Sequence, residues 1–293
     1  MRKFIIYIDA GTTSNRSILF DLKGKPVFSS QKEFTQYFPK SGWVEHNPEE
    51  IWRTTVKTLK DVIQKAKKLR GEILNIGITN QRETTVLWDK RTGKPVYNAI
   101  VWQDRRQEEF CAKLRKQNKD TMIFNKTGLL IDSYFSGTKI KWILDNVPKA
   151  KKLMNSNQLL FGTIDSFLIW RFTKGKIHAT DATNASRTMI YNITSNRWDD
   201  TILKLLKIKK NILPEVKDCA DDFGQTHSSI TGKSIPINGV VGDQQSATIG
   251  QCCFEPGSLK STYGTGAFVL LNTGNKNPIS KKIIPRIKNN FCI

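Results

Sequence analysis

The sequence predicts an α/β fold, because apolar strands alternate with amphipathic helices along most of the chain. Three strands come first, over residues 4–8, 17–20 and 27–34, and polar turns join them into a meander. A long helix follows, and strand and helix patterns then alternate up to about residue 250. We therefore expect a sheet flanked by helices.

The first helix is predicted from its start signal and its apolar face. Asn47 is the expected N-cap, Pro48 takes the first helical position, and Glu50 completes an arrangement that resembles a capping box. Apolar residues then recur at steps of three and four, at Trp52, Val56, Leu59, Ile63 and Ala66. One face of this helix should therefore be buried.

The later elements are predicted from the same two periodicities. Strands are expected over 73–78, 85–88, 94–101 and 236–241, and helices over 105–117, 137–146, 164–172, 199–207 and 244–250. Leu259–Tyr263 and Ala267–Leu271 bracket Gly264-Thr-Gly as a hairpin. After Gly274 the periodicity fails, so residues 275–293 are expected to form a frayed or disordered end.

The composition is that of a folded protein without a membrane span. Of 293 residues, 38% are hydrophobic, with 15 Phe and 7 Trp, which favours a globule over disorder. The longest apolar runs are too short to cross a bilayer. The apolar N-terminal stretch meets Asp9 at once, unlike a signal peptide. A cytoplasmic protein is therefore the expectation.

The net charge of +21 allows two interpretations. A nucleic-acid or acidic-membrane partner would explain it. However, the lysines are scattered, with short clusters at 65–70, 149–152 and 204–210, and no aromatic-interleaved basic motif accompanies them. We therefore expect a solvated basic surface without a nucleic-acid partner. A nucleic-acid-binding protein, with salt-sensitive binding, is kept as the weakest alternative.

The cysteines and histidines do not predict a site. Five cysteines, with no CxxC pair, disfavour a disulfide framework or a zinc site. The three histidines are isolated in the sequence and are expected to be structural or exposed. They are His46, His178 and His227.

Residues 9–14 read Asp-Ala-Gly-Thr-Thr-Ser and lie where the first strand ends. Gly11 lets the backbone approach a ligand closely, and the N–H groups and hydroxyls of 12–14 suit a phosphate. Asp9 is placed to hold Mg²⁺ through water, and Arg16 adds a positive charge. An ordinary hairpin turn uses the same residue types. No GxxxxGK[ST] motif occurs, so a P-loop is not the route to a phosphate site.

Arg82 and Glu83 are adjacent residues of opposite charge just after a predicted strand. They can present a donor fork and an acceptor to one polyhydroxyl ligand, although a surface ion pair is the commoner use of such residues. Trp102 and Tyr134 add aromatic surface nearby in the sequence. An aromatic wall with a few directed polar groups is what a small polyol pocket needs.

Asp243 follows the predicted strand 236–241 and precedes Gln244 and a short helix. A carboxylate there can reach a substrate hydroxyl as a general base. Asp243 can instead be the N-cap of the helix, and the local pattern alone favours this capping role. The Gly264-Thr-Gly motif is equally compatible with a turn that binds phosphate and with an ordinary hairpin turn.

Six segments, taken together, carry a family resemblance. In order they are Asp9–Arg16, Gly42-Trp-Val-Glu-His, Gly77-Ile-Thr-Asn-Gln-Arg-Glu-Thr-Thr, Val101-Trp-Gln-Asp-Arg-Arg, Thr183-Asn-Ala-Ser-Arg-Thr-Met and Gly242-Asp-Gln-Gln. This order resembles the glycerol kinases, a branch of the FGGY carbohydrate kinases. The similarity runs from about residue 4 to about residue 274.

The resemblance implies an actin-like ATPase fold of the ribonuclease H-like kind, with a mixed sheet flanked by helices. Residues 1–241 would form the N-terminal FGGY domain, 242–274 the beginning of the second domain, and 275–293 an irregular tail. The implied activity is that of an ATP:glycerol 3-phosphotransferase in glycerol catabolism. Glycerol and ATP would be the small-molecule partners, Mg²⁺ the cofactor, and a homo-oligomer a further expectation.

The resemblance also implies a role for each matching residue. Asp243 would accept the proton of a terminal hydroxyl as that oxygen attacks the γ-phosphorus of ATP. Asp9 would help to place Mg²⁺. The residues implied to contact glycerol are Arg82, Glu83, Trp102, Tyr134, Asp243, Gln244 and Phe268. Those implied to hold the nucleotide phosphates are Thr12, Thr13, Ser14, Arg16 and Thr265.

Two departures from the family pattern leave alternatives open. Ala10 stands where many members carry Gln, and this change should be tolerated because the loop backbone contacts the phosphate. Members are also substantially longer, so the chain is expected to be truncated early in the second domain. The alternatives are a catalytically inactive polyol-binding remnant and a kinase for another small polyol or sugar. The face near residues 244–254 and the hairpin is expected to be exposed and apolar.

Overall fold

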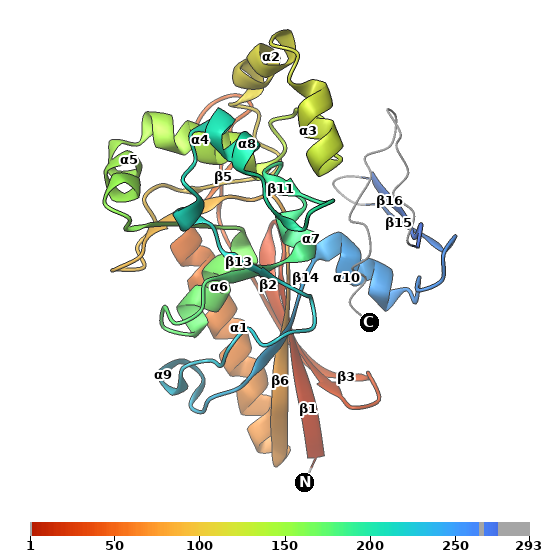
Figure 1. Cartoon of the computed structure of the whole chain (residues 1–293). Helices are drawn as coiled ribbons and strands as arrows, with labels where there is room; N and C mark the ends of the chain where they lie inside the picture. Colours follow the sequence, from red (N-terminus) through yellow and green to blue (C-terminus); the bar gives the residue numbers. More distant parts are fainter. Residues whose placement is uncertain (1, 264–266, 275–293) are drawn as a thin grey trace.

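A mixed five-stranded sheet is the centre of the fold in the computed structural model, which describes residues 2–263 and 267–274 (Figure 1). In order across the sheet, the strands are β14 (Ile237–Gly242), β6 (Gly71–Asn80), β1 (Arg2–Ala10), β2 (Ser14–Asp21) and β3 (Pro26–Glu33). β1 pairs antiparallel with β2 and parallel with β6, and β14 pairs parallel with β6. The predicted mixed sheet is confirmed.

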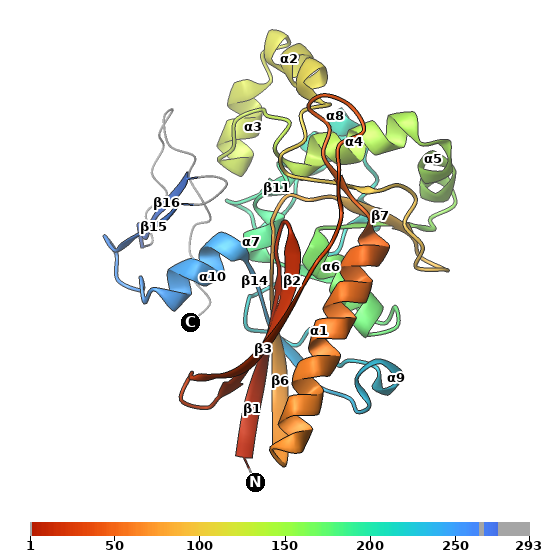
Figure 2. The ribbon, with the colours of Figure 1, turned by 180° about the vertical axis from the view of Figure 1, so that it is seen from behind.

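Helix α1 (Pro48–Lys68) lies along one face of this sheet and starts where the sequence predicts (Figure 2). Asn47 is its N-cap, and the side-chain oxygen of Asn47 accepts a hydrogen bond from the Glu49 N–H at 2.9 Å. The helix buries one face against the strands, with Ile51, Leu59, Val62 and Ala66 among the buried residues.

The capping box predicted at Glu50 is wrong. The Glu50 carboxylate accepts hydrogen bonds from the Thr35 N–H at 3.0 Å and from the Tyr37 hydroxyl at 2.7 Å. Two donors, Thr35 after β3 and Tyr37 of β4 (Gln36–Tyr37), therefore compete with the single N–H of the N-cap. The carboxylate still lies in the first helical turn, where the helix dipole favours a negative charge.

The other elements are short and surround the main sheet. The helices are α2 (Glu108–Lys116), α3 (Asp120–Thr127), α4 (Ser136–Asn146), α5 (Pro148–Asn155), α6 (Ile164–Phe172), α7 (Ala182–Ala185), α8 (Asp200–Leu206), η1 (Lys210–Ile212), α9 (Ser228–Thr231) and α10 (Asp243–Gly250). The small sheets pair β4 (Gln36–Tyr37) with β5 (Glu45–His46) and β8 (Ala99–Ile100), and β7 (Val86–Asp89) with β9 (Leu159–Gly162). They also pair β10 (Ala179–Asp181) with β13 (Glu215–Lys217), β11 (Tyr191–Asn192) with β12 (Arg197–Trp198), and β15 (Leu259–Tyr263) with β16 (Ala267–Leu271).

The strand predicted over 94–101 is wrong for most of its length. Only β8 is extended and paired in a sheet there. Pro95 makes an isolated bridge to Trp88, and the Val96 N–H donates to the Leu87 carbonyl. Because proline has no N–H to give to a ladder, this segment folds back on β7 as an irregular loop.

Hydrophobic side chains form two clusters. One lies between the main sheet and helices α1 and α6, and its members include Ile6, Ile8, Leu59, Ile78 and Phe167. The other lies among α2, α3, α4, α5 and α8, and its members include Leu114, Ile123, Ile140, Met154 and Leu206. Figure 1 shows this second group of helices beyond the carboxyl ends of β1 and β6. The loops that leave those strands therefore run between the two clusters.

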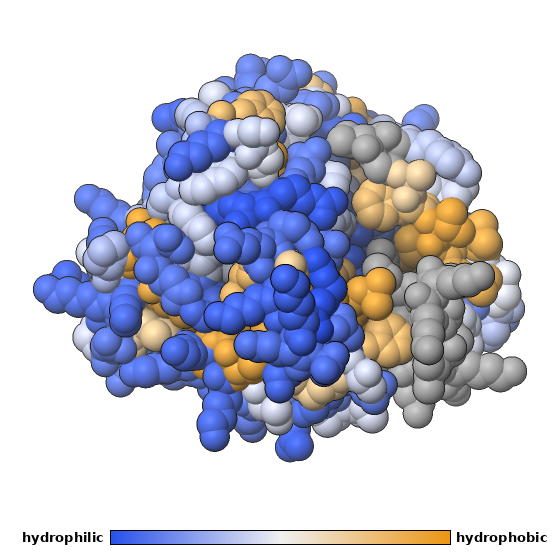
Figure 3. All heavy atoms as spheres, turned by 90° about the horizontal axis from the view of Figure 1, so that it is seen from above, coloured by the Kyte–Doolittle hydropathy of each residue, from blue (hydrophilic) through white to orange (hydrophobic). Residues whose placement is uncertain are grey.

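The hairpin of β15 and β16 exposes apolar side chains, as predicted. Leu259, Val269 and Leu271 are 57%, 60% and 54% exposed. Figure 3 shows orange, apolar surface gathered on the side of the molecule where the hairpin lies. The predicted Gly264-Thr-Gly turn and the predicted irregular tail at 275–293 lie outside the described residues.

Two further features of the described chain bear on its class. Within residues 2–263 and 267–274, none of the helices has the length and apolar character needed to cross a membrane. The cysteines of this part are all free thiols; Cys252 is exposed, and Cys111, Cys219 and Cys253 are buried.

Asp165 is fully buried at the start of α6 and makes the stability of the chain pH-dependent. Its carboxyl accepts from the hydroxyls of Thr163 and Thr180 at 2.5 and 2.6 Å. Burial, followed by the charge of Asp181, raises the pKa of Asp165 from 3.8 to about 7. An acid with a raised pKa stabilises the fold fully below its unfolded pKa, and that contribution is lost as pH rises through the folded pKa.

We therefore predict that Asp165→Asn gains stability relative to the parent chain as pH rises from about 4 to 8, by up to about 4 kcal/mol. Urea unfolding at several pH values measures the difference. A difference that is constant with pH would contradict the prediction. Asp222→Asn, at an exposed position, is the matched control and should show no such trend.

Candidate active site

Parallel strand ends meet at one edge of the main sheet. Ala10 of β1 and Gly242 of β14 both pair with Asn80 of β6. Arg82 and Asp243, which follow two of these strands, therefore come together although 161 residues separate them. The carboxyl ends of strands are the usual place of ligand sites in open α/β sheets.

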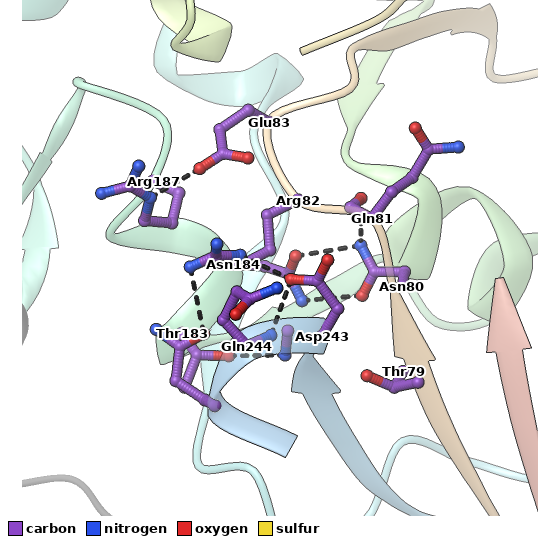
Figure 4. Close-up of polar contacts among 12 residues, drawn as sticks. Thr79, Asn80, Gln81, Arg82, Glu83, Thr183, Asn184, Arg187, Asp243 and Gln244 are labelled. Carbon is purple, nitrogen blue, oxygen red and sulfur yellow. Dashed lines mark hydrogen bonds and ion pairs between the residues drawn. The ribbon is translucent and has the colours of Figure 1, made fainter. Parts of the chain in front are cut away.

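Arg82 is buried and held against Asp243 (Figure 4). Its Nε donates to Asp243 Oδ1 at 2.8 Å, and its Nη1 donates to Gln245 Oε1 at 3.2 Å. Burial alone would lower the pKa of Arg82, but the negative charges of Glu83 and Asp243 raise it above its usual range. The Arg82 side chain is 1% exposed and that of Asp243 is 39% exposed, so a fixed cation holds a carboxylate that a ligand can reach.

The helix-capping interpretation of Asp243 is wrong. Helix α10 begins at Asp243, and its N-cap is Gly242, which makes no side-chain hydrogen bond. Asp243 Oδ1 accepts from the Gln244 N–H at 2.7 Å in addition to Arg82. The carboxylate thus contacts both the N–H of the next residue and the side chain of Arg82, which follows β6.

Gly242 leaves the room that the Arg82 side chain fills. A Cβ on Gly242 would lie 2.5 Å from Arg82 Cδ and 2.8 Å from Arg82 Cγ. The Gly242 N–H also donates to Thr183 Oγ1 at 2.8 Å, which holds the strand end in place. Adding a methyl group must therefore displace Arg82.

We predict that Gly242→Ala lowers the free energy of unfolding by about 1–3 kcal/mol, because the added methyl group must displace the Arg82 side chain. Urea unfolding measures the change. Gly250→Ala is the matched control, because a Cβ there meets nothing within 4 Å. An unchanged free energy of unfolding in Gly242→Ala would show that Arg82 can be displaced without cost.

Glu83 pairs with Arg187 rather than with its neighbour (Figure 4). The backbone of Glu83 is left-handed, with φ 62°, and this breaks the alternation of side-chain directions along an extended segment. Arg187 Nε donates to Glu83 Oε1 at 2.5 Å, and the two side chains are 3% and 2% exposed. The alternative of a surface ion pair between Arg82 and Glu83 is therefore wrong.

Trp102 and Tyr134 lie together as an aromatic wall, with ring centroids 5.7 Å apart. The buried Lys139 fixes the segment that carries Tyr134, because its Nζ donates to the carbonyls of Ser133, at 2.9 Å, and of Tyr134. Burial lowers the pKa of Lys139 to about 7. The Arg187 guanidinium lies 5.5 Å from the Tyr134 ring centroid and so connects this wall to Glu83.

The turn between β1 and β2 carries the residues predicted to bind phosphate. The Gly11 N–H donates to the Ser14 carbonyl at 3.0 Å, and Arg16 Nη2 donates to Asp9 Oδ2 at 3.0 Å. Burial raises the pKa of Asp9; Arg16 opposes this effect, and the charge of Asp243 adds to it. Asp9 and Asp243 are therefore close enough for their charges to interact.

Two hydroxyl groups of this turn accept hydrogen bonds from other elements. Trp102 Nε1 donates to Thr12 Oγ1 at 3.0 Å, and Gln31 Nε2 donates to Ser14 Oγ at 2.9 Å. Accepting a hydrogen bond does not use the proton of a hydroxyl, so each group keeps a donor of its own. Thr13 is exposed.

The remaining predicted residues lie on α10 and the hairpin. Gln244 is buried, and its Oε1 accepts from the buried Lys260 of β15 at 2.7 Å, which ties the hairpin to the helix. Phe268 is half-buried on β16, opposite Thr262, and its contact with a polyol stays a prediction. Thr265 lies outside the described residues.

Sequence reasoning missed a group of side chains behind the strand ends. Asn80 and Asn184 exchange two hydrogen bonds of 3.0 Å each, and Asn184 Nδ2 also donates to Asp181 Oδ1 at 2.7 Å. Arg187 follows on the same segment. The segment 183–189 matched the family pattern, but the pattern alone does not reveal contacts made across 104 residues.

The described part of the chain holds no ready-made metal centre. Across residues 2–263 and 267–274, no group of three or more His, Cys, Asp or Glu side chains could hold a metal ion. Asp9, near the end of β1, and Asp243, directly after β14, are two acidic groups at this edge of the main sheet. Mg²⁺ commonly uses one or two carboxylates with water and substrate phosphates, so this donor set fits Mg²⁺ better than a metal that needs a full protein cage.

Comparison with protein families gives a match over most of the chain. Residues 4–250 match the model described as "FGGY family of carbohydrate kinases, N-terminal domain". A glycerol kinase of Rhizobium meliloti (strain 1021) is 59% identical over 281 residues, which cover 96% of this chain and 56% of the relative. A glycerol kinase of Sinorhizobium fredii is 60% identical over 274 residues, which cover 94% and 55%. The chain thus spans about half the length of these relatives.

Solved structures agree with this assignment. A crystal structure of Plasmodium falciparum glycerol kinase with ADP superposes with a TM-score of 0.92 at 40% identity, covering 94% of this chain and 55% of that chain. A gluconate kinase from Lactobacillus acidophilus gives a TM-score of 0.82 at 25% identity, covering 92% and 54%. The actin-like kinase fold implied by the resemblance is therefore confirmed, and the chain belongs to the FGGY family of carbohydrate kinases.

Proposed function

We propose that the chain provides the polyol-binding and phosphoryl-acceptor side of a glycerol kinase, which transfers the γ-phosphoryl group of ATP to a terminal hydroxyl of glycerol. One observation carries this proposal above all. The reachable carboxylate of Asp243 is held by the buried Arg82 where parallel strand ends meet. Relatives at 59% and 60% identity that are named glycerol kinases support glycerol as the polyol.

Asp243 would act as the general base. Its carboxylate is partly exposed and is fixed by the Arg82 guanidinium, so it can accept a proton from a hydroxyl placed beside it. Arg82 would donate to a second hydroxyl oxygen, and Glu83 would accept from a hydroxyl. Trp102 and Tyr134 would cover the carbon backbone of the polyol, with Gln244 and Phe268 at the edge of the site.

The turn at residues 11–14 would receive the phosphates of ATP. The backbone N–H groups and the hydroxyls of Thr12, Thr13 and Ser14 would be the donors, and Arg16 would add a positive charge. Thr265 would contribute from the hairpin turn. Phosphoryl transfer needs chiefly alignment and charge stabilisation, which donors of this kind supply.

Mg²⁺ fits the acidic groups at this edge. Asp9 would hold it, because burial and the nearby charge of Asp243 already raise the pKa of Asp9 and a divalent cation would relieve both effects. When bound, the ion neutralises charge on the transferring phosphoryl group.

The domain assignment goes with this proposal. Residues 1–241 would carry most of the residues of the polyol and phosphate sites. Residues 242–274 would begin the second FGGY domain and would add Asp243, Gln244, Thr265 and Phe268. Because the chain spans 56% of the Rhizobium meliloti relative, turnover by this chain alone is the point to test first. An inactive polyol-binding protein and a kinase for another polyol or sugar are the competing functions.

A coupled assay for glycerol 3-phosphate, with glycerol and Mg·ATP, tests the proposal. We expect product from the purified chain and calorimetric binding of glycerol. Binding without product would favour the inactive polyol-binding protein, and faster turnover of gluconate or xylulose would favour another substrate. A folded chain that neither binds glycerol nor forms product would overturn the proposal.

A further inference from the structure

We propose that Arg187 is a positioning residue of the polyol site, which holds the Glu83 carboxylate in the orientation that receives a hydroxyl of the polyol. This inference rests on the proposed function, because it assigns a partner to a residue expected to bind glycerol. Arg187 itself is not placed against the substrate.

The contact between the two side chains is direct and shielded from water. Arg187 Nε donates to Glu83 Oε1 at 2.5 Å, and both side chains are at least nine-tenths buried. In Figure 4 the second oxygen of Glu83 lies on the side of Arg82, away from Arg187. One carboxylate oxygen is thus held by the guanidinium, and the other points away from it.

The backbone of Glu83 is fixed independently of Arg187. Its left-handed conformation has φ 62°, and its carbonyl accepts from Ser136 Oγ at 3.0 Å and from Thr85 Oγ1 at 3.1 Å. With the backbone held by these hydroxyls, the direction of the carboxylate depends on the side-chain partner. Arg187 supplies that partner from a segment 104 residues away.

Arg187 is in turn held by the aromatic wall. Its guanidinium carbon lies 5.5 Å from the Tyr134 ring centroid and 4.9 Å from that of Phe135. Guanidinium groups stack favourably on aromatic faces, and a rigid planar fork orients a carboxylate better than a flexible ammonium does. Arg187 therefore sets Glu83 relative to Tyr134, which is itself expected to contact the polyol.

A purely structural ion pair is the competing interpretation. Arg187 Nη1 is buried and has no hydrogen-bond partner within the described part of the chain. An ion pair selected for stability alone would be expected to satisfy that donor, since an unpaired buried donor is destabilising. The incomplete pairing is better explained by a guanidinium placed to orient one carboxylate oxygen.

Glycerol binding by four variants separates these interpretations. The dissociation constant is measured by calorimetry on the full chain for Arg187→Met, Arg187→Lys, Glu83→Gln and the double variant, each shown to be folded by circular dichroism. We expect Arg187→Met to weaken binding roughly ten- to hundred-fold, with a smaller loss for Arg187→Lys. Because Arg187 acts through Glu83, the double variant should bind no more weakly than Glu83→Gln alone.

Arg106→Met is the matched control, because Arg106 is also a buried arginine paired with carboxylates. It should lower stability without changing the dissociation constant of the folded protein. If Arg187→Met binds glycerol as tightly as the parent chain, the inference is overturned and the proposed function still stands. If Arg187→Met does not fold, the same result for Arg187→Lys overturns the inference. The inference is also overturned if the variant that combines Arg187→Met with Glu83→Gln binds glycerol much more weakly than Glu83→Gln does. A parent chain that binds no glycerol overturns the proposed function and this inference with it.

Discussion

Replacing Asp243 by Asn is expected to lower phosphoryl transfer to glycerol by roughly 10²- to 10⁴-fold, because the amide cannot accept the hydroxyl proton. The shape of the side chain is kept, and Arg82 Nε can still donate to the side-chain oxygen that now takes the place of Oδ1. The coupled assay for glycerol 3-phosphate measures the loss. Binding of glycerol should weaken much less than turnover does.

The control for this substitution makes the same chemical change at the surface. Asp221, whose side chain is 40% exposed, pairs with Lys217 at 3.7 Å, so Asp221→Asn should leave turnover unchanged. If Asp243→Asn retained turnover within about twofold, another group would have to accept the proton, and the general-base role of Asp243 would fall.

Arg106→Met is expected to destabilise the chain by about 3–5 kcal/mol, because it leaves buried carboxylates without a counter-charge. The Arg106 side chain is fully buried, and its Nη2 lies 2.7 Å from Asp104 Oδ2 and 2.8 Å from Glu45 Oε1. Its guanidinium carbon also lies 3.8 Å from the Trp43 ring centroid. Urea unfolding measures the change in the free energy of unfolding.

The neighbouring residue supplies a close control. Arg105 pairs with Asp132 at 3.0 Å, but its side chain is 58% exposed. Arg105→Met should therefore cost less than about 1 kcal/mol, as surface ion pairs usually do. Equal losses in the two variants would mean that burial of the Arg106 ion pair does not govern its contribution.

The part of the fold that was predictable consists of elements long enough to show a period. Strands β1, β2, β3 and β6 and helices α1 and α4 each extend over eight or more residues, so hydrophobic spacing identifies them. Two-residue strands such as β8 and β11 carry no such period, and their pairing is decided by distant segments. Glu50 shows the same limit at a helix start, because its partners, Thr35 and Tyr37, lie 15 and 13 residues earlier in the chain.

The residues of the candidate site also fall into two groups, those that the sequence could identify and those that it could not. Arg82 and Asp243 each follow a strand end, but their local patterns favoured a surface ion pair and a helix cap, and the family resemblance was needed to select them. The parallel pairing of the strands then explains why the two residues meet. Arg187 and Asn184 could not be identified, since their contacts with Glu83 and Asn80 arise only from tertiary packing. The resemblance marked their segment without assigning them a role.

The hydrogen bond between Trp102 and Thr12 has a thermodynamic consequence. It joins the aromatic wall to the turn at residues 11–14, which is proposed to bind phosphate, across 90 residues, so a shift of one favours a shift of the other. The two binding equilibria are therefore expected to share a coupling free energy, which must be reciprocal. The factor by which a nucleotide changes the affinity for polyol equals the factor by which polyol changes the affinity for nucleotide. The hydrogen bond of a single indole N–H would thus make the affinity for each substrate depend on whether the other substrate is bound.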